Sequence, residues 1–297
     1  MRAAAILGKT ASPYDLRPFE SAGVTIDVLP DLPPASNPKL KLETETPFDA
    51  ALIFGGDGSL HRQLPAAIAS QTPVLCVPTG SGNDFSRAIG IAARADALAA
   101  WQKSTSGAAN IRSVDVAQIT PTRGSGLAAR YYACIAGAGL DSEVNRRANA
   151  MPAWLRAHGG YVLALPPTLW SFQAPHVTVE LFDSDGPARI SEPAMLVAFA
   201  NAPSYGDGMR MAPRAQLDDG RLDLCFVRRT SKLRLLRLFP VVFSGGHLRL
   251  PEVIYARCSG LRIEADRPLD IFGDGEFICQ TPAEVRMKPR ALRVIVP

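Results

Sequence analysis

The sequence is poor in the residue patterns that hold metal ions or disulfide frameworks. Its five cysteines lie far apart with no CxxC pair, and no two of its four histidines are four residues apart. An odd, scattered set of cysteines argues against a disulfide framework and a zinc ribbon, and the histidine spacing excludes an HExxH site. Such cysteine usage is typical of a reducing compartment, so we expect a cytoplasmic protein.

Long apolar runs and a strong net charge are lacking as well. About six apolar residues separate Arg2 from Lys9, too few for a secretory signal, and the longest uncharged stretch, 157–179, contains three prolines and would make a poor transmembrane helix. The net charge of +4 is too small to indicate nucleic-acid binding, so we expect no nucleic-acid partner. At ~150 residues per domain, 297 residues suggest two domains.

The two halves of the chain differ in pattern. Up to about residue 110, short apolar runs alternate with helical patterns, which favours a doubly wound parallel sheet. We expect strands there at 3–7, 23–29, 50–54 and 73–77, a loop at 31–47, and helices at 60–70, 84–89 and 92–102. Later, turn residues separate short strand-like runs, which predicts a mainly antiparallel β domain with few long helices. Its expected strands are 114–119, 130–135, 177–182, 194–200, 222–227, 261–264 and 292–296, and its one clear helix is 231–243.

Two glycine-rich segments follow neighbouring predicted strands. Gly55-Gly-Asp-Gly-Ser59 ends one strand, and Pro78-Thr-Gly-Ser-Gly-Asn-Asp84 ends the next. Glycine lets backbone N–H groups approach an anion, and ligands bind at the carboxyl edge of open α/β sheets. The pair predicts a crevice for a polyphosphate, whereas two ordinary strand–helix turns are the simpler interpretation. Gly8-Lys9-Thr10 is no Walker A loop, since position 3 is alanine.

Two acidic segments and one basic segment mark the second half. Residues 217–223 hold three carboxylates, which we expect around a turn that can bind a hard cation through one carboxylate and backbone carbonyls. Gly273-Asp-Gly-Glu276 offers a carboxylate for taking a proton from a hydroxyl. Both acidic segments are also typical of ordinary hairpin turns without a bound ion or a catalytic role. Residues 228–237 carry five cations interleaved with leucines, which fits a helix on an anionic membrane or an ordinary solvated surface helix.

Taken in order, these motifs resemble the diacylglycerol kinase catalytic domain family, with the sphingosine kinases and bacterial soluble lipid kinases. Gly55-Gly-Asp-Gly-Ser59 resembles its GGDGT, and Pro78-Thr-Gly-Ser-Gly-Asn-Asp-Phe85 resembles P-L-G-T-x-N-D-F. The segment Gly208-Met-Arg-Met-Ala-Pro-Arg-Ala-Gln-Leu-Asp-Asp-Gly-Arg-Leu-Asp223 resembles G-M-x-x-A-P-x-A-x-x-D-D-G-x-L-D, and Gly246-His-Leu and Asp274-Gly-Glu276 also match. The matches span roughly residues 50–280.

The resemblance implies an α/β nucleotide-binding domain akin to NAD kinase over 1–112, and a C-terminal β-sandwich for the lipid acceptor over 113–289. A last strand at about 290–297 would return to the first domain. It implies an ATP-dependent and Mg²⁺-dependent kinase of a lipid hydroxyl, that of diacylglycerol or a related lipid. Such an enzyme would meet its lipid at the inner face of the membrane as a peripheral protein, and a homodimer is one assembly that the resemblance allows.

The resemblance also implies the site. Glu276 would be the base for the lipid hydroxyl, Asp274 would support it, and Asp57 would lie near the phosphates and the catalytic Mg²⁺. A structural Mg²⁺ would be held by Asp219 and the backbone carbonyls of Gln216 and Arg221. The nucleotide would be bound by residues of the two glycine-rich segments: Gly55, Gly56, Asp57, Gly58, Ser59, Leu60, His61, Gly80, Ser81, Gly82, Asn83 and Asp84.

The first strand is where the sequence departs from the family. The usual N-P-x-S-G loop is absent, and Leu7-Gly-Lys-Thr-Ala-Ser-Pro13 stands in its place. Ser59 replaces a threonine, and His61 replaces an asparagine. Two alternatives therefore stay open: a kinase of a soluble substrate, similar to NAD kinase, and a degenerate member that binds nucleotide or lipid without turnover.

Overall fold

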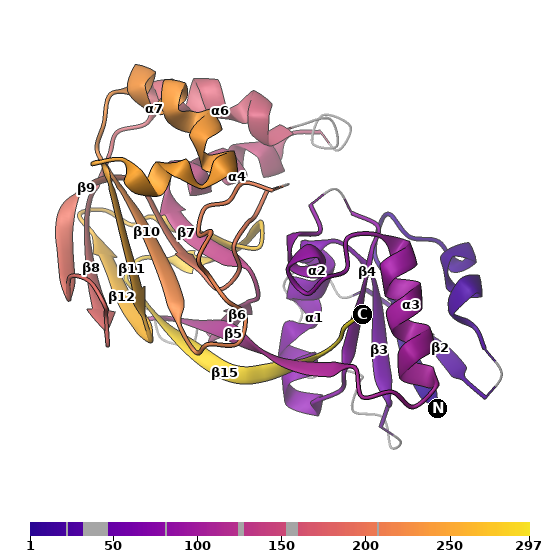
Figure 1. The fold of residues 1–297 in the computed structure, drawn as a ribbon. Helices are drawn as coiled ribbons and strands as arrows, with labels where there is room; N and C mark the ends of the chain where they lie inside the picture. Colours follow the sequence, from indigo (N-terminus) through magenta and orange to yellow (C-terminus); the bar gives the residue numbers. More distant parts are fainter. Residues whose placement is uncertain (22, 32–46, 81, 124–127, 153–159, 207) are drawn as a thin grey trace. The chain divides into compact units, whose positions relative to one another are not determined.

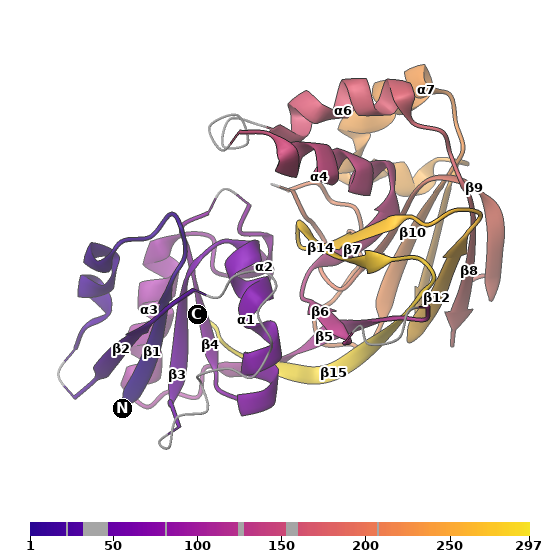
Figure 2. The ribbon, with the colours of Figure 1, turned by 180° about the vertical axis from the view of Figure 1, so that it is seen from behind.

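The computed structural model describes residues 1–21, 23–31, 47–80, 82–123, 128–152, 160–206 and 208–297, and its chain divides into two compact units (Figures 1 and 2). Unit 1 comprises Met1–Val116, Leu217–Asp219 and Lys288–Pro297, and unit 2 comprises Ala117–Gln216 and Gly220–Met287. The loop expected over 31–47 lies almost wholly outside the described residues.

Unit 1 is built on a parallel sheet in the order β4–β3–β1–β2. Its strands are β1 (Arg2–Leu7), β2 (Thr25–Leu29), β3 (Ala50–Gly55) and β4 (Val74–Pro78). All residues of β3 and β4 are buried, as a parallel sheet covered on both faces requires. The final strand of the chain, β15 (Ala283–Ile295), reaches this sheet where Val294 pairs in parallel with Val74. The expected parallel sheet is confirmed.

Helices cover both faces of this sheet. They are η1 (Pro13–Phe19), α1 (Asp57–Ser70), α2 (Asp84–Ala88) and α3 (Arg94–Thr105). On β3, Ala51 shares an apolar cluster with Ala66 of α1, whereas Phe54 packs edge to face on Phe19 of η1. Because residues of opposite parity on a strand point to opposite faces, α1 and η1 lie on opposite sides. The indole N–H of Trp101 donates to the Phe19 carbonyl, so α3 lies with η1, in front of the strands in Figure 1.

Unit 2 is a β-sandwich whose two antiparallel sheets share β9. The first half of β9 pairs with β8, beside β12 and β15, and its second half pairs with β7 and β10. Apolar residues of both sheets, such as Val179 and Phe199, form one buried core, which confirms the expected antiparallel domain. The strands are β5 (Ile111–Pro121), which begins in unit 1, β6 (Arg130–Tyr132), β7 (Ile135–Gly139), β8 (His176–Phe182), β9 (Arg189–Ala200), β10 (Leu222–Arg228), β11 (Val253–Cys258), β12 (Gly260–Ala265), β13 (Asp270–Gly273) and β14 (Glu276–Gln280).

Helical segments gather at one end of the sandwich, and we call them the helical cap. The cap consists of α4 (Leu140–Ala150), α6 (Gly160–Ser171), α7 (Lys232–Leu238), η2 (Phe239–Ser244) and η3 (Gly246–Arg249). Both views show α6 and α7 side by side (Figures 1 and 2). The expectation of few helices was wrong for α4 and α6. The helix expected over 231–243 is also shorter than predicted, because the chain tightens to a 3₁₀ helix at Phe239, just before Pro240.

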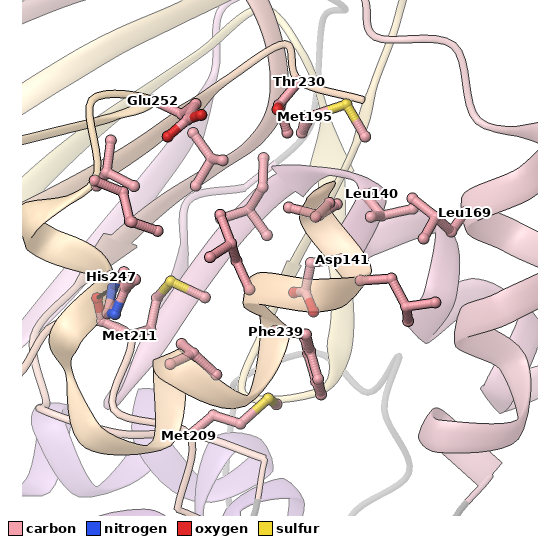
Figure 3. Close-up of a pocket in the computed structure, with 18 of the residues that line it drawn as sticks. Leu140, Asp141, Leu169, Met195, Met209, Met211, Thr230, Phe239, His247 and Glu252 are labelled. Carbon is pink, nitrogen blue, oxygen red and sulfur yellow. Dashed lines mark hydrogen bonds between the residues drawn. The ribbon is translucent and has the colours of Figure 1, made fainter. Parts of the chain in front are cut away.

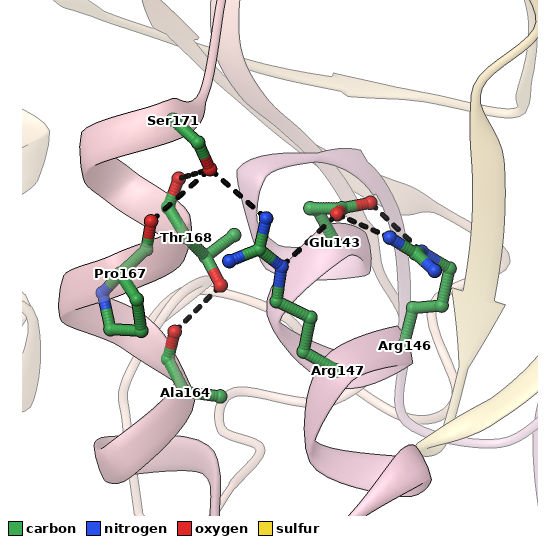
Figure 4. Close-up of polar contacts among 7 residues, drawn as sticks. All are labelled: Glu143, Arg146, Arg147, Ala164, Pro167, Thr168 and Ser171. Atoms are coloured by element: carbon green, nitrogen blue, oxygen red, sulfur yellow. Dashed lines mark hydrogen bonds and ion pairs between the residues drawn. The ribbon is translucent and has the colours of Figure 1, made fainter.

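Polar contacts join α4 to α6 (Figure 4). Arg147 of α4 contacts Glu143 one turn earlier and donates to the Ser171 hydroxyl of α6 at 3.0 Å. Within α6, Pro166 and Pro167 lack the N–H groups that a helix needs, and the Thr168 hydroxyl adds a hydrogen bond to the Ala164 carbonyl at 2.6 Å. Packing and side-chain hydrogen bonds therefore stabilise a helix that intrinsic propensity disfavours.

Candidate active site

Three loops meet at the carboxyl edge of the unit 1 sheet, after β1, β3 and β4. The Gly8 N–H donates to the Phe54 carbonyl at 2.7 Å, and the Thr79 N–H donates to the Gly55 carbonyl at 3.2 Å. The hydroxyls of Thr10 and Thr79 lie 3.0 Å apart. The two glycine-rich segments therefore lie together as the sequence predicted, and the loop after β1 joins them.

Close backbone approach explains the glycines. A Cβ on Gly80 would lie 2.8 Å from the Gly56 Cα, and a Cβ on Gly55 would lie 2.4 Å from the Ser59 hydroxyl oxygen. A Cβ on Gly82 would come within 3.0 Å of the Asp57 carboxylate. A larger residue at Gly80 would therefore have to move backbone, and one at Gly55 or Gly82 would have to displace the side chain of Ser59 or Asp57. The loops thus leave backbone N–H groups uncovered by side chains, as anion-binding loops do.

Asp57 ties the two glycine-rich segments together. Its two carboxylate oxygens accept the backbone N–H groups of Asp84 and Phe85, each at 3.0 Å. These are the first N–H groups of α2, which a helix leaves without partners of its own. Asp84 is buried and pairs with Arg87 at 2.9 Å. Asp57 therefore fixes the second loop relative to the first, and its predicted contact with phosphate stays a prediction.

Asn83 supplies an unsatisfied acceptor beside these loops. It adopts the left-handed conformation at φ 55°, and its side-chain N–H donates to the Gly80 carbonyl at 2.6 Å. Its Oδ1 is buried and has no hydrogen-bond partner among the described residues. Buried polar atoms are nearly always satisfied, so this oxygen is expected to accept a hydrogen bond from a ligand or water. Ser81, also predicted here, lies outside the described residues.

Helix α1 begins at Asp57 rather than at residue 60, so Asp57, Gly58 and Ser59 form its first turn. Ser59 is buried, and its hydroxyl accepts from Arg62 at 3.2 Å. Two further predicted nucleotide contacts lie on the same helix. Leu60 is 3% exposed and packs inward, whereas His61 is half-buried.

In unit 2, Asp274 anchors the turn between β13 and β14. Asp274 and Gly275 both have positive φ, at 51° and 84°, which glycine adopts freely and aspartate tolerates. The Asp274 carboxylate accepts the backbone N–H groups of Ala133, Cys134 and Ile135 at 2.7, 2.9 and 3.3 Å. Its contacts are those of a residue that positions the turn.

Glu276 is the first residue of β14 and is half-buried. It pairs with Gly273 across the hairpin, and Asn149 of α4 donates to the Gly275 carbonyl at 3.1 Å. The backbone that carries Glu276 is thus held by β13, by Asp274 and by the helical cap. Burial, and then the charge of Asp274, raises the pKa of nearby Tyr132 well above its usual value, so that phenol stays neutral.

The expected gathering of three carboxylates over 217–223 was wrong. Asp218 is exposed and pairs with Arg112 at 2.7 Å, whereas Asp223 is fully buried in β10 and accepts the Tyr255 hydroxyl. The described residues contain no cluster of three His, Cys, Asp or Glu side chains that could hold a metal ion. The Mg²⁺ site that was predicted on this segment uses only the Asp219 carboxylate and the backbone carbonyls of Gln216 and Arg221, and it stays a prediction.

The helical cap encloses an apolar cavity of about 110 Å³ in unit 2 (Figure 3). Its polar groups are few. The Tyr205 hydroxyl donates to Asp141 at 2.8 Å, and His247, which is 6% exposed, has its Nε2 3.1 Å from the Met211 carbonyl. The apolar lining comes from the helical cap, from strands β9, β10 and β11, and from the segments around residues 210 and 250: Leu140, Leu165, Leu169, Met195, Leu196, Met209, Met211, Val227, Leu235, Leu236, Leu238, Phe239, Val242, Leu250 and Val253.

The sequence predicted no part of this cavity. One signal was present: residues 163–171 carry no charge and place Leu165 and Leu169 four residues apart, on one helix face. Helix α4 links the cavity to the acidic turn, because Leu140 and Asp141 line the cavity and Asn149 contacts Gly275. Asn149 lies eight positions after Asp141 on this helix, a rise of about 12 Å.

Comparison with known proteins gives consistent matches over both units. Residues 15–119 match the model of the diacylglycerol kinase catalytic domain, and residues 134–296 match that of the YegS C-terminal NAD kinase beta sandwich-like domain. A diacylglycerol kinase of Mycobacterium tuberculosis (strain ATCC 25618 / H37Rv) is 31% identical over 255 residues, which cover 84% of this chain and 77% of that protein.

Solved structures share the fold. A diacylglycerol kinase from Bacillus anthracis str. Sterne superposes with a TM-score of 0.70 at 18% identity, covering 100% of this chain and 96% of that one. Yeast NADH kinase, solved with NADH, superposes with a TM-score of 0.53 at 11% identity, covering 100% and 84%. The expected NAD kinase-like first domain and β-sandwich second domain are confirmed.

Proposed function

This chain belongs to the diacylglycerol kinase catalytic domain family, and from that premise we propose that it transfers the γ-phosphoryl group of ATP to the hydroxyl of a diacylglycerol or a related lipid. One observation carries the choice of a lipid acceptor: the apolar cavity under the helical cap. A kinase of a soluble substrate has no use for such a cavity, whereas a lipid kinase must shelter an acyl chain. Burial of each methylene contributes about 0.8 kcal/mol to binding.

The unit 1 loops fit a nucleotide. A Cβ would fill the space between Gly56 and Gly80, and the Asn83 Oδ1 is a buried acceptor without a partner in the described chain. We assign the phosphates to these loops and to the first turn of α1, where backbone N–H groups and the helix dipole favour anions. Exposed Lys9 adds a cation in the loop that Thr10 joins to Thr79. That loop would contact the nucleotide at the position where the family has its N-P-x-S-G loop.

Mg²⁺ prefers oxygen ligands, and the candidate residues supply them. We assign Asp57 to the metal that accompanies the phosphates. We assign Asp219, with the backbone carbonyls of Gln216 and Arg221, to a second, structural ion. Bound ATP and Mg²⁺ supply the phosphoryl group and offset its charge, and the chain's own part is positioning and proton transfer.

Glu276 is the residue we assign to proton transfer. Its carboxylate would accept the proton of the lipid hydroxyl as that oxygen attacks phosphorus, and the leaving group would be ADP. Asp274 acts as a positioning residue, because three backbone N–H groups already occupy its carboxylate. Helix α4 connects this turn with the cavity, so one lipid can present its hydroxyl near Glu276 while its acyl chain lies under the cap.

The test is transfer of labelled γ-phosphate from Mg·ATP to candidate acceptors in mixed micelles. The panel holds diacylglycerol, monoacylglycerol, ceramide, sphingosine and phosphatidylglycerol, with NAD as a soluble control. Label on a lipid supports the proposal and names the acceptor. Label on NAD alone would favour the soluble-substrate kinase, and nucleotide binding without any transfer would favour a degenerate member.

A further inference from the structure

Exposed apolar side chains concentrate on the outer surface of the helical cap. Among the described residues of unit 2, five of the six large apolar side chains that are exposed lie on α6, α7 and η2. They are Leu163, Trp170, Leu233, Leu236 and Phe243, between 48% and 69% exposed. Monomeric proteins rarely leave such side chains grouped in water, so the group indicates an interaction surface.

These segments adjoin one another. The Lys232 ammonium group of α7 donates to the Trp170 carbonyl of α6, and Figures 1 and 2 agree that the two helices lie side by side. Leu163 and Trp170 are seven residues apart on α6, and Leu233 and Leu236 are three apart on α7, so each pair shares a helix face.

The charge of this region has one sign. Residues 228–250 contain six cations and no acid. Arg228 pairs with Glu192 at 2.8 Å, and Arg234 pairs with Glu252. The other arginines are exposed, and the described part of the chain offers them no acid: Arg229, Arg237 and Arg249.

Helix α7 separates this surface from the cavity. Leu235 and Leu238 line the cavity, and Leu233 is 65% exposed and does not. Leu236 takes part in both, since it lines the cavity and is 49% exposed. No residue of α7 is fully buried, so its position depends on contacts with α6 and the cavity wall. A ligand entering the cavity from this side meets α7 first.

We propose that the outer face of the helical cap, made of Leu163, Trp170, Leu233, Leu236 and Phe243 with Arg229, Arg237 and Arg249, docks on an anionic lipid bilayer. Apolar side chains enter the interface, where tryptophan is favoured, and the arginines contact lipid phosphates. No described helix is long and apolar enough to span a bilayer, so the contact is at the surface. The inference rests on the proposed function, since docking would bring the cavity to its lipid.

The test is sedimentation with vesicles of phosphatidylcholine containing phosphatidylglycerol, and with vesicles of phosphatidylcholine alone. Wild-type protein is expected to sediment with the anionic vesicles and much less with the neutral ones. The double variant Trp170→Gln/Leu233→Gln should weaken anionic binding about tenfold. The double variant Arg229→Gln/Arg249→Gln should weaken it about 20-fold and remove most of its salt dependence. Val28→Gln and Arg189→Gln, exposed residues outside the cap, are matched controls that should bind like wild type.

Activity measured in parallel separates this inference from the proposed function. On a short-chain diacylglycerol dissolved as monomers, Trp170→Gln/Leu233→Gln should match wild type, while its activity on vesicle-embedded lipid falls with binding. If the double variants bind vesicles more weakly than wild type, but wild type phosphorylates no lipid, the docking surface is supported and the proposed function is overturned. Wild-type vesicle binding by both double variants would overturn the docking surface, whatever the activity.

Discussion

The carboxylate of Asp274 accepts the backbone N–H of Cys134 at 2.9 Å, which fastens the turn before Glu276 to the chain between β6 and β7. This contact indicates different roles for the two acids of Asp274-Gly-Glu276. Aspartate anchors the turn, Gly275 adopts its φ of 84°, and Glu276 is left as the carboxylate assigned to chemistry. Two acids of one turn, separated by a single glycine, thus acquire different roles from their surroundings.

Replacing Asp274 should therefore lower both the free energy of unfolding and the rate of the reaction. Asp274→Ala removes the acceptor of three backbone N–H groups and places alanine at φ 51°, so the free energy of unfolding should fall by about 3 kcal/mol. Asp274→Asn keeps one side-chain oxygen and tolerates this φ, so its loss should be about half as large. Denaturant unfolding measures both. Equal stability of Asp274→Ala and wild type would contradict the anchoring role.

Glu276→Gln should separate chemistry from folding. The side chain keeps its size but cannot accept a proton at neutral pH, so kcat should fall by about 10²-fold to 10⁴-fold while KM and the unfolding midpoint hardly change. Glu264→Gln, at an exposed side chain of strand β12, is the matched control and should leave kcat unchanged. Steady-state kinetics on the identified lipid checks this, and full activity in Glu276→Gln would remove Glu276 from the mechanism.

Gly80→Ala tests the close approach of the two loops. The new Cβ would lie 2.8 Å from the Gly56 Cα, and backbone cannot yield as a flexible side chain can. We expect KM for ATP to rise by about tenfold or more, because displaced loops lose hydrogen bonds to phosphate. Gly107→Ala is the control: it too is strained, at φ 87°, but it lies outside the loops. A rise in KM for both variants would point to general destabilisation instead.

His247 should make stability depend on pH. Burial lowers its pKa in the folded protein, while in the unfolded chain its pKa stays at about 6.5. As pH falls below that value, the unfolded state takes up the proton first, so the free energy of unfolding decreases, by at most about 1.4 kcal/mol per pH unit. His247→Gln should flatten this part of the profile. Unfolding midpoints at about pH 7.5 and about pH 5.5 measure it, and identical profiles would exclude His247.

The sequence predicted the parts of the fold that local pattern determines. Strands β1, β3 and β4 are continuous apolar runs, and the loops that follow β3 and β4 are rich in glycine. Because parallel strands end at one edge, those loops had to meet there. The order of the motifs was sufficient to predict the family and the β-sandwich domain. The contacts of Asp57 with α2 depended on helix geometry that spacing alone does not give.

Tertiary packing decided what the sequence could not predict. Helix α6 contains Pro166 and Pro167 and resembles a loop by propensity, yet Leu165 and Leu169 bury their side chains in the cap. Asp223 looked like a turn carboxylate, but it lies inside β10, which pairs with β9 and β11, and accepts the Tyr255 hydroxyl. The cavity joins residues more than 50 positions apart, and no local motif reports such a volume.

Narrowing the cavity should shorten the lipids that the enzyme accepts. Leu196 of β9 is half-buried and lines the cavity, so Leu196→Phe would place its ring where an acyl chain would lie. If the ring displaces two methylenes, KM for a long-chain diacylglycerol should rise by about tenfold, since each buried methylene contributes about 0.8 kcal/mol. A short-chain diacylglycerol should be phosphorylated as before, because it does not reach the narrowed region. Val28→Phe, at an exposed position in unit 1, should leave KM unchanged for both the long-chain and the short-chain diacylglycerol. An equal rise for both chain lengths would mean that the acyl chain binds elsewhere.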